Sequence, residues 1–537
     1  MAHPSGDLPG GVLFLDFLLN WGMKSFWKHL VACNLILVAP VVVLAQASEA
    51  DNQAIIRESK SNNQALTWLS QLSKDIGPRR TGSQNLGRAQ DWAMKLLKSW
   101  GWQNVRLEKW GEVPVGFERG KNYYGGLVAP FKWNLKFSSA AWTAGSNGPR
   151  RAEVVLEPQT LEELRANPSK YKGKWILMQT MQSMRGSRPS PPMTADERTK
   201  NPAGAVREDV EKALDAVGIA GKVFGQSEKR NWVHTHGTWS TINPKSLPTD
   251  VRVNISYSDH RLVRKTIESG RKPEVEFNVD QKFIPGAVPQ YNVVADLPGF
   301  DKADEIVMIG GHLDSWDGPG SQGTSDNGTG TCINLEAARL ISTTRSKPRR
   351  TLRIVLWSGE EQGLLGSQVD AAKVDRMKIA AVFNEDSGSN FQDSISAHPK
   401  WVPILERAFQ PYRAAFPQWP VRVNSTNSDR WPRGGGSDHA AYLAKGIPAF
   451  AWGKRGPQSY GFIWHTLNDT FENAFPEALA QMSVNHALLA LNVACSDEIL
   501  WRPETMPVAF FDLRKIGGYV GCHEDPEIEN VIGDHAH

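Results

Sequence analysis

The feature that most restricts the fold of this 537-residue chain is an alternation of apolar runs and helical segments between residues 291 and 494. Uninterrupted runs such as EIVMIGG (305–311), TLRIVLWSG (351–359) and KIAAVFNED (378–386) alternate with segments whose apolar residues follow helical spacing. Strands buried on both faces have such runs, and helices connect them across a largely parallel sheet. The pattern predicts an α/β fold with three layers, α/β/α, around a largely parallel central sheet.

Residues 112–287 have a different sequence pattern. This segment has a Pro- and Arg-rich loop and two units of helix followed by strand, but no cluster of chemically reactive side chains. It predicts a smaller α+β or β domain inserted into the α/β domain, which would then consist of residues 48–111 and 288–505. Residues 51–110 are predicted to be helical, chiefly over 63–77 and 85–101.

The ends of the chain predict segments outside both domains. Residues 1–47 are predicted to be an N-terminal extension and signal peptide, because Lys24 and Lys28 precede an apolar run that closes at Ala45-Gln46-Ala47. That run is shorter than the ~20 residues of a spanning helix. We therefore expect secretion or periplasmic export by a cleaved signal, with no stable membrane insertion afterwards. Residues 506–537 are expected to be a C-terminal tail.

Composition excludes several classes of protein. A net charge of +4 is small for this length, and no basic run interleaved with aromatics occurs, so nucleic acid is not an expected partner. The four cysteines are widely spaced and form no CxxC zinc motif. A metal in this protein must therefore be bound by His, Asp and Glu.

Side chains of this kind follow three successive predicted strands. In open α/β sheets, ligands gather beyond the carboxyl ends of the strands, and loops can deliver further residues to the same edge. A histidine or acid at a strand end is by itself more often a cap or a turn residue, so the prediction rests on their joint occurrence at one edge. The candidates are His312, Asp326, Glu360, Glu361, Asp386 and His465.

The ligand types indicate the kind of metal site. Imidazole and carboxylate without thiolate suit zinc, manganese or cobalt, and argue against an iron–sulfur site or a cysteine-bound structural zinc. A single catalytic zinc takes three protein ligands, so two histidines, two aspartates and one of the adjacent glutamates exceed its needs. Two ions that share one carboxylate would use all five, and such pairs occur in hydrolytic enzymes.

Six motifs together resemble a known family: GPRRTGS, GGHLDSWD, SDNGTG, SGEEQGLLGS, NEDSG and WHTLNDT. They are similar to those of the dizinc exopeptidases that include secreted aminopeptidases and plasma glutamate carboxypeptidase (carboxypeptidase Q), and GGHLDSWD is most like the carboxypeptidase Q branch. The resemblance implies the zinc exopeptidase fold, two Zn²⁺ per chain and short peptides or dipeptides as substrates. Residues 112–287 resemble the protease-associated domain of such enzymes.

The resemblance also implies a role for each candidate. His312, Asp326 and Asp386 would hold one zinc ion, while Asp326, Glu361 and His465 would hold the other, so that Asp326 bridges the two ions. A cis peptide bond would follow the bridging aspartate, between Asp326 and Asn327.

Two further carboxylates receive catalytic roles from the resemblance. Glu360 would be the general base, since it is free of metal and adjacent to a ligand. Asp314 would orient the imidazole of His312 and raise its basicity.

Several alternatives stay open at this point. The enzyme could be an aminopeptidase or a dipeptidase of the carboxypeptidase Q type. A glutaminyl cyclase-like acyltransferase with one zinc ion shares this fold, and so do receptor-like relatives that are catalytically inactive binding modules. Asp438 and His439 are either supports of the site or purely structural, and Tyr460 is either an oxyanion donor or a packed aromatic. The sequence does not predict the oligomeric state.

Overall fold

The computed structural model describes residues 47–504, except 183–192, 228, 230, 231, 241, 346 and 427. The predicted signal peptide and the predicted C-terminal tail therefore lie outside the described residues.

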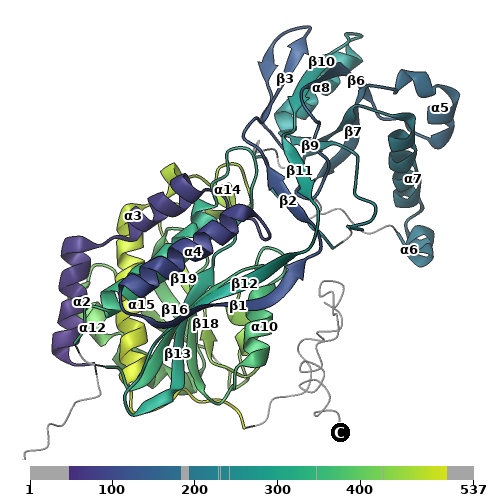
Figure 1. Ribbon diagram of the computed structural model, residues 1–537. Helices are drawn as coiled ribbons and strands as arrows, with labels where there is room; N and C mark the ends of the chain where they lie inside the picture. The colour runs from purple at the N-terminus through teal and green to yellow at the C-terminus, as the bar shows by residue number, and fades with distance from the viewer. Residues whose placement is uncertain are drawn as a thin grey trace, which may run out of the picture. The chain divides into compact units, whose positions relative to one another are not determined.

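A central sheet of six strands organises the first part of the structure, in the order β1-β12-β14-β13-β15-β18 (Figure 1). The strands are β1 Gln103–Val113, β12 Val288–Leu297, β13 Lys302–His312, β14 Arg350–Trp357, β15 Ile379–Asn384 and β18 Ala449–Phe450. β14, β13, β15 and β18 are parallel to their neighbours, whereas β12 and β1 form an antiparallel edge. The predicted α/β fold with a largely parallel sheet is confirmed.

Helices cover the central sheet, and Figure 1 shows α4 and α15 on one side of its strands and α10 on the other. Ile309, Ile354 and Val382 are fully buried between these layers. The helices that belong to this part are α2 Glu49–Asn62, α3 Ala65–Ser70, η1 Gln71–Ile76, α4 Gln84–Ser99, η3 Thr324–Gly328, α9 Thr329–Ile341, α10 Leu365–Lys373, η4 Pro399–Trp401, α11 Val402–Ala408, α12 Gln410–Ala415, α13 His439–Leu443, α14 Tyr460–Ile463, η5 Phe471–Asn473 and α15 Pro476–Cys495.

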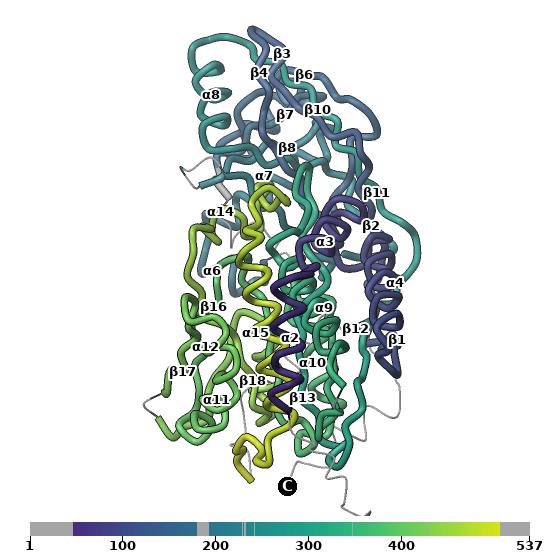
Figure 2. The backbone as a smooth tube through the Cα atoms, turned by 90° about the vertical axis from the view of Figure 1, so that its left-hand side faces the viewer, coloured from purple at the N-terminus to yellow at the C-terminus, as the bar shows by residue number. Residues whose placement is uncertain are grey.

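Helix α15 is the one described helix long and apolar enough to span a membrane by length and composition, yet 89% of that stretch is buried inside the protein. Figure 2 shows α2 beside it, and the side-chain amide of Asn492 in α15 donates to that of Asn52 in α2 (2.8 Å). Burial on most of its surface explains why apolar residues occur on all of its faces. Within the described residues α15 is therefore a core helix.

A second sheet forms between β1 and β12, in the order β4-β3-β10-β6-β7-β8-β9-β5, and β2 pairs separately with β11. Its core includes Trp175, Val253 and Phe277. The elements are β2 Gly116–Arg119, β3 Tyr124–Ala129, β4 Trp133–Asn134, β5 Phe137–Ser138, β6 Arg150–Leu156, α5 Leu161–Ala166, η2 Pro168–Lys170, β7 Trp175–Gln182, α6 Ala195–Lys200, α7 Pro202–Val217, β8 Gly221–Gln226, β9 Arg252–Ile255, α8 Tyr257–Glu268, β10 Glu274–Asn278 and β11 Gln281–Ile284. The predicted boundaries at 112 and 287 fall at the end of β1 and just before β12, and the division into domains stays a prediction.

One local prediction is wrong, and one apolar run is divided between two strands. Residues 103–110 are not helical but belong to β1, an edge strand whose many solvent-facing polar residues conceal the strand pattern. The run IPAFAW at 447–452 is not one strand: β18 ends at Phe450, and β19 Trp452–Arg455 joins a separate sheet. That sheet has the order β17-β16-β19, with β16 Phe391–Ala397 and β17 Arg422–Ser425.

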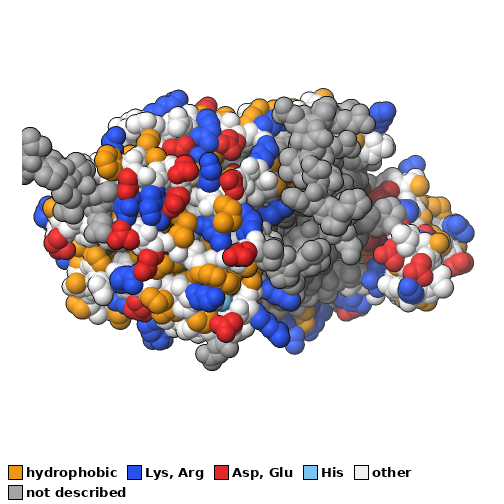
Figure 3. Space-filling model, turned by 90° about the horizontal axis from the view of Figure 1, so that it is seen from below, with side chains coloured by type: hydrophobic (Ala, Val, Ile, Leu, Met, Phe, Trp, Pro, Cys, Tyr) orange, Lys and Arg blue, Asp and Glu red, His pale blue; other side chains and the backbone are white. Residues whose placement is uncertain are grey.

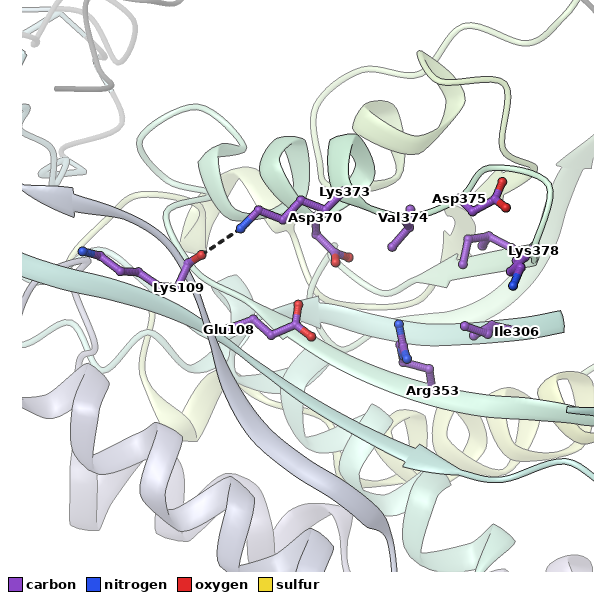
Figure 4. A pocket seen from close by; sticks show the side chains of 10 residues that line it. Glu108, Lys109, Ile306, Arg353, Asp370, Lys373, Val374, Asp375 and Lys378 are labelled. Carbon is purple, nitrogen blue, oxygen red and sulfur yellow. Dashed lines mark hydrogen bonds between the residues drawn. The ribbon is translucent and has the colours of Figure 1, made fainter. Parts of the chain in front are cut away.

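The described surface mixes charges of both signs, as expected from the small net charge. Figure 3 shows acidic and basic side chains interspersed over one face. A hollow of about 490 Å³ is lined by charged side chains that include Glu108, Arg353 and Lys373 (Figure 4). It reaches Ile306 and Ile379, near the starts of β13 and β15, so it lies away from the carboxyl ends of these strands.

Candidate metal centre

All five predicted ligands come together at the carboxyl edge of the central sheet. Each is delivered by a different element. His312 is the last residue of β13, Asp386 and Glu361 follow β15 and β14, Asp326 lies in η3, and His465 follows α14.

The ligand atoms form two groups that share one residue. The Nε2 atom of His312 lies 3.4 Å from Oδ1 of Asp326 and 3.4 Å from Oδ1 of Asp386. The Nε2 atom of His465 lies 3.3 Å from Oδ2 of Asp326 and 2.9 Å from Oε2 of Glu361. The two carboxylate oxygens of Asp326 therefore face different histidines.

Three of these four separations match those of atoms that bind a common metal, and the fourth, between His465 and Glu361, is shorter. Zinc holds His and carboxylate ligands at ~2.0–2.1 Å, so two ligands of a tetrahedral zinc lie about 3.3–3.4 Å apart. His312 Nε2, Asp326 Oδ2 and Asp386 Oδ1 are buried and have no hydrogen-bond partner among the described protein residues. Buried polar atoms without partners are costly. The donor set therefore fits two zinc ions that share Asp326.

The electrostatics of the cluster also favour cations. Burial raises the pKa of Glu361 to about 7, and repulsion from Asp326 adds to this effect. Burial opposes protonation of His465, but Glu361 and Asp326 outweigh it and raise the pKa to about 10. Burial likewise opposes protonation of His312, whose pKa is nevertheless raised well above its usual value by Asp386 and Glu360. Such a concentration of buried negative charge is stabilised by bound cations.

Asp314 contacts both Glu360, the other predicted catalytic carboxylate, and the candidate ligand His312. Its carboxylate accepts hydrogen bonds from the hydroxyl of Thr81 (2.7 Å) and the backbone N–H of Glu360 (3.3 Å). Nδ1 of His312 lies 2.9 Å from the backbone carbonyl of Asp314 but 3.6 Å from its carboxylate. Asp314 thus contacts the imidazole chiefly through its main chain, and its carboxylate positions Glu360.

Glu360 lies beside the ligands and is less buried than Glu361. Its Oε2 atom is 3.8 Å from Nε2 of His312, and its side chain is 13% exposed, against 2% for Glu361. Burial raises the pKa of Glu360 well above its usual value. These features suit a group that exchanges a proton and is not required as a ligand.

The segment that carries Asp326 approaches other main chain closely. The predicted cis peptide bond between Asp326 and Asn327 is present. The side-chain amide of Asn327 donates to the carbonyl of Glu385 (2.8 Å), and its oxygen accepts from the N–H of Gly330 (3.0 Å). A Cβ atom at Gly330 would lie 2.2 Å from the Glu385 carbonyl oxygen. Glycine is therefore required at this position for steric reasons.

Two residues that hold this segment were not singled out from the sequence. The carboxylate of Asp469 accepts the backbone N–H groups of Ser325 (2.6 Å) and Asp326 (3.2 Å). The fully buried guanidinium of Arg79 donates to the carbonyls of Leu313 (2.9 Å) and Gly323 (2.7 Å). Both residues stand inside the motifs WHTLNDT and GPRRTGS, but their partners are backbone atoms, so ligand spacing gave no sign of them.

Two tryptophans flank His465. The ring of Trp464 lies 4.4 Å from the imidazole, and that of Trp316 lies 6.0 Å from it. The backbone N–H of Trp316 also donates to Oε1 of Glu361 (3.1 Å). Trp452 instead packs against His486 at 4.9 Å, within the core.

Three other candidates lie near the ligands, and their roles stay predictions. Asp438 is fully buried, and burial raises its pKa to about 7. His439 is 8% exposed, and burial lowers its pKa although Asp386 acts in the opposite direction. Tyr460 stacks on Trp464 at 6.4 Å.

Comparison with known proteins shows which family the chain resembles. The model of peptidase family M28 matches residues 292–490, the segment that contains all five candidate ligands. This segment is therefore similar to the M28 peptidases. Mouse (Mus musculus) carboxypeptidase Q is 26% identical over 449 residues, which cover 82% of this chain and 88% of the mouse protein. Bovine (Bos taurus) carboxypeptidase Q is 28% identical over 334 residues, covering 62% of this chain and 66% of the bovine protein.

A solved structure supports the same conclusion. The crystal structure of the peptidase M28 precursor from Shewanella amazonensis SB2B superposes with a TM-score of 0.58 at 25% identity, covering 84% of this chain and 98% of that one. The predicted family resemblance is confirmed. The protein is a zinc metallo-exopeptidase, and peptides are its substrates.

The anchoring of Asp326 by Asp469 is testable in this peptidase. In Asp469→Asn, one of the two acceptor oxygens becomes an NH₂ group that faces a backbone N–H, so the segment loses an anchor. We expect zinc affinity to fall by about 10–100-fold, as for other partners behind metal ligands. Competition with a chelator measures it, and Asp304→Asn, at an exposed aspartate, is the matched control. Equal affinity in both variants would remove Asp469 from the support of the site.

Proposed function

We propose that this chain is an exported exopeptidase with a dinuclear zinc centre that hydrolyses dipeptides or short peptides. His312, Asp326 and Asp386 would bind one ion, and Asp326, Glu361 and His465 the other. The observation that carries the proposal is the position of Asp326, whose two oxygens lie 3.4 and 3.3 Å from different histidines.

The protein groups divide the work of hydrolysis. Zinc ions bound here would lower the pKa of water and polarise the scissile carbonyl. Glu360 would accept the proton of the attacking water and transfer it to the amine leaving group. Asp314 would fix the backbone of Glu360, and Trp316 would fix the carboxylate of Glu361.

Similarity to carboxypeptidase Q over 82% of the chain supports a dipeptidase of that type, with an aminopeptidase as the second candidate. We also propose that residues 112–287 are an inserted protease-associated-like domain. The presence of all five ligands together with Glu360 speaks against an inactive binding module. A glutaminyl cyclase-like enzyme would require only one of the two metal sites.

Metal content and substrate choice test this proposal together. We expect two zinc ions per chain after dialysis, measured by mass spectrometry, and turnover of dipeptides in a panel that also contains amino-acid anilides. Cleavage of the anilides would instead identify an aminopeptidase. One tightly bound zinc with cyclisation of glutaminyl peptides would identify a cyclase. Absence of both metal and turnover after zinc is supplied would refute the centre.

The role of Glu360 requires a separate variant. Glu360→Gln retains the size of the side chain but cannot accept the proton, so we expect kcat to fall by about 10²–10⁴-fold. Zinc content should stay at two ions, because Glu360 is not a proposed ligand. Glu112→Gln, at an exposed position, is the control. Wild-type turnover in Glu360→Gln would assign the proton transfer to another group.

Export is proposed from residues 23–47, the part of the predicted N-terminal extension in which Lys24 and Lys28 precede the apolar run that closes at Ala45-Gln46-Ala47. The side chain of Ser48, directly after the predicted cleavage site, caps helix α2 by accepting from the N–H of Asp51 (3.1 Å). We expect the mature protein to begin at Ser48, determined from its intact mass after recovery from the periplasm or the medium. Ala45→Phe should block processing, since the cleavage site needs small residues. Recovery of the exported protein with residues 23–47 still attached would contradict cleavage.

A further inference from the structure

We propose that Thr235, in the segment between β8 and β9, is a positioning residue for the zinc site formed by His465 and Glu361. The segment 112–287 would thereby control one of the two zinc sites more strongly than the other. This inference rests on the proposed dinuclear centre.

Thr235 holds the backbone of a ligand. Its N–H donates to the carbonyl of His465 (2.7 Å), and the N–H of Leu467 donates to the carbonyl of Val233 (3.0 Å). His234 and Thr466 form an antiparallel bridge between these two hydrogen bonds. His465 has a φ of +54°, in a region that residues other than glycine rarely adopt. Pairing at the carbonyl of His465 and over the two residues that follow it stabilises this conformation.

The side chain of Thr235 also contacts the loop that runs from His312 to Asp326. A Cβ atom added at Gly318 would lie only 2.4 Å from the methyl carbon of Thr235. Thr235 therefore packs directly on the backbone of this loop. Buried at 1% exposure, it lies between the loop and His465.

The same loop contacts both ligands of this zinc site. Trp316 donates its backbone N–H to Glu361 and places its ring against His465. Its ring belongs to an apolar cluster with Trp142 and Trp239, which come from residues 112–287. Docking of this segment therefore affects the surroundings of both His465 and Glu361.

A buried ion pair joins the same two parts of the chain. Nε of Arg119, at the end of β2, lies 2.9 Å from Oδ1 of Asp317, and both side chains are 8% exposed. Arg80 also pairs with Asp317 (3.1 Å). Breaking such a pair leaves an uncompensated buried charge, so the loop is firmly tied to β2.

The other zinc site depends on different contacts. His312 ends β13, which is hydrogen-bonded to β14 and β15 on its two sides, and Asp386 follows β15. The central sheet fixes these ligands. A disturbance at Thr235 should consequently weaken the His465 and Glu361 site before the His312 and Asp386 site.

The contact between Thr235 and Gly318 can be tested with one variant that creates a steric clash and a second that removes it. Gly318→Ala places a methyl group against the Thr235 methyl, whereas Thr235→Ser removes that methyl and retains the N–H that binds His465. We expect Gly318→Ala to weaken one of the two zinc affinities by about 10–100-fold and to leave the other within about threefold. The Gly318→Ala/Thr235→Ser double variant should recover both. Titration with zinc against a competing chelator resolves the two affinities.

A matched control separates positioning from general damage. Lys222 is fully buried in the same segment and pairs with Asp215 (2.8 Å), away from the ligands. Lys222→Met should lower the stability of the segment without a selective loss of one zinc site. If Gly318→Ala does not fold, Thr235→Gly removes the same contact without a clash and should weaken the same site.

The outcomes distinguish the two hypotheses. A wild-type chain that binds fewer than two zinc ions would refute the dinuclear centre itself. A wild type with two ions would refute only the role of Thr235 if Gly318→Ala weakened both sites equally or neither. Failure of Thr235→Ser to rescue, or the same selective loss in Lys222→Met, would refute it as well.

Discussion

The carboxylate of Asp326, which faces a different histidine with each oxygen, is the constraint on which the rest of the site depends. To reach that position its backbone must pass close to the main chain after β15, and this requires a glycine at 330. The side chains that support the segment bind its backbone. Arg79 donates to carbonyls and Asp469 accepts N–H groups, so the oxygens of Asp326 stay available to metal.

This arrangement also explains how the protein tolerates so many buried acids. A cation placed directly on Asp326 would neutralise it and compete with metal. Instead the guanidinium of Arg79 donates to carbonyl groups, so it does not neutralise the charge of a candidate ligand. Because Arg79 binds carbonyl groups and not Asp326, the negative charge of Asp326, Glu361 and Asp386 can be neutralised by divalent ions. Stability of the loop and affinity for metal are thus provided by separate groups.

The central sheet, and the clustering of the candidate ligands at its carboxyl edge, could be predicted from sequence because the strands follow a clear apolar pattern. Apolar runs defined β13, β14 and β15, and three of the five candidate ligands, His312, Glu361 and Asp386, lie at or just after their ends. Where structure depends on main-chain partners, the sequence carried no signal: Arg79, Asp469 and the pairing of 233–235 with 465–467 are of this kind. β1 was missed because an edge strand needs no continuous apolar run. Asp314 was assigned to His312 through its carboxylate, yet the closer contact is its carbonyl.

The candidate ligands of the two proposed zinc sites are held in place in different ways. A residue at the end of a central strand is held in position by the hydrogen bonds on both sides of that strand, and His312 is such a residue. A ligand on a loop lacks this frame and needs bracing from elsewhere. His465, with a positive φ after the short helix α14, is such a ligand, and its bracing comes from residues nearly half the chain away. The segment between β1 and β12 can therefore support the proposed metal centre although none of the five candidate ligands comes from it.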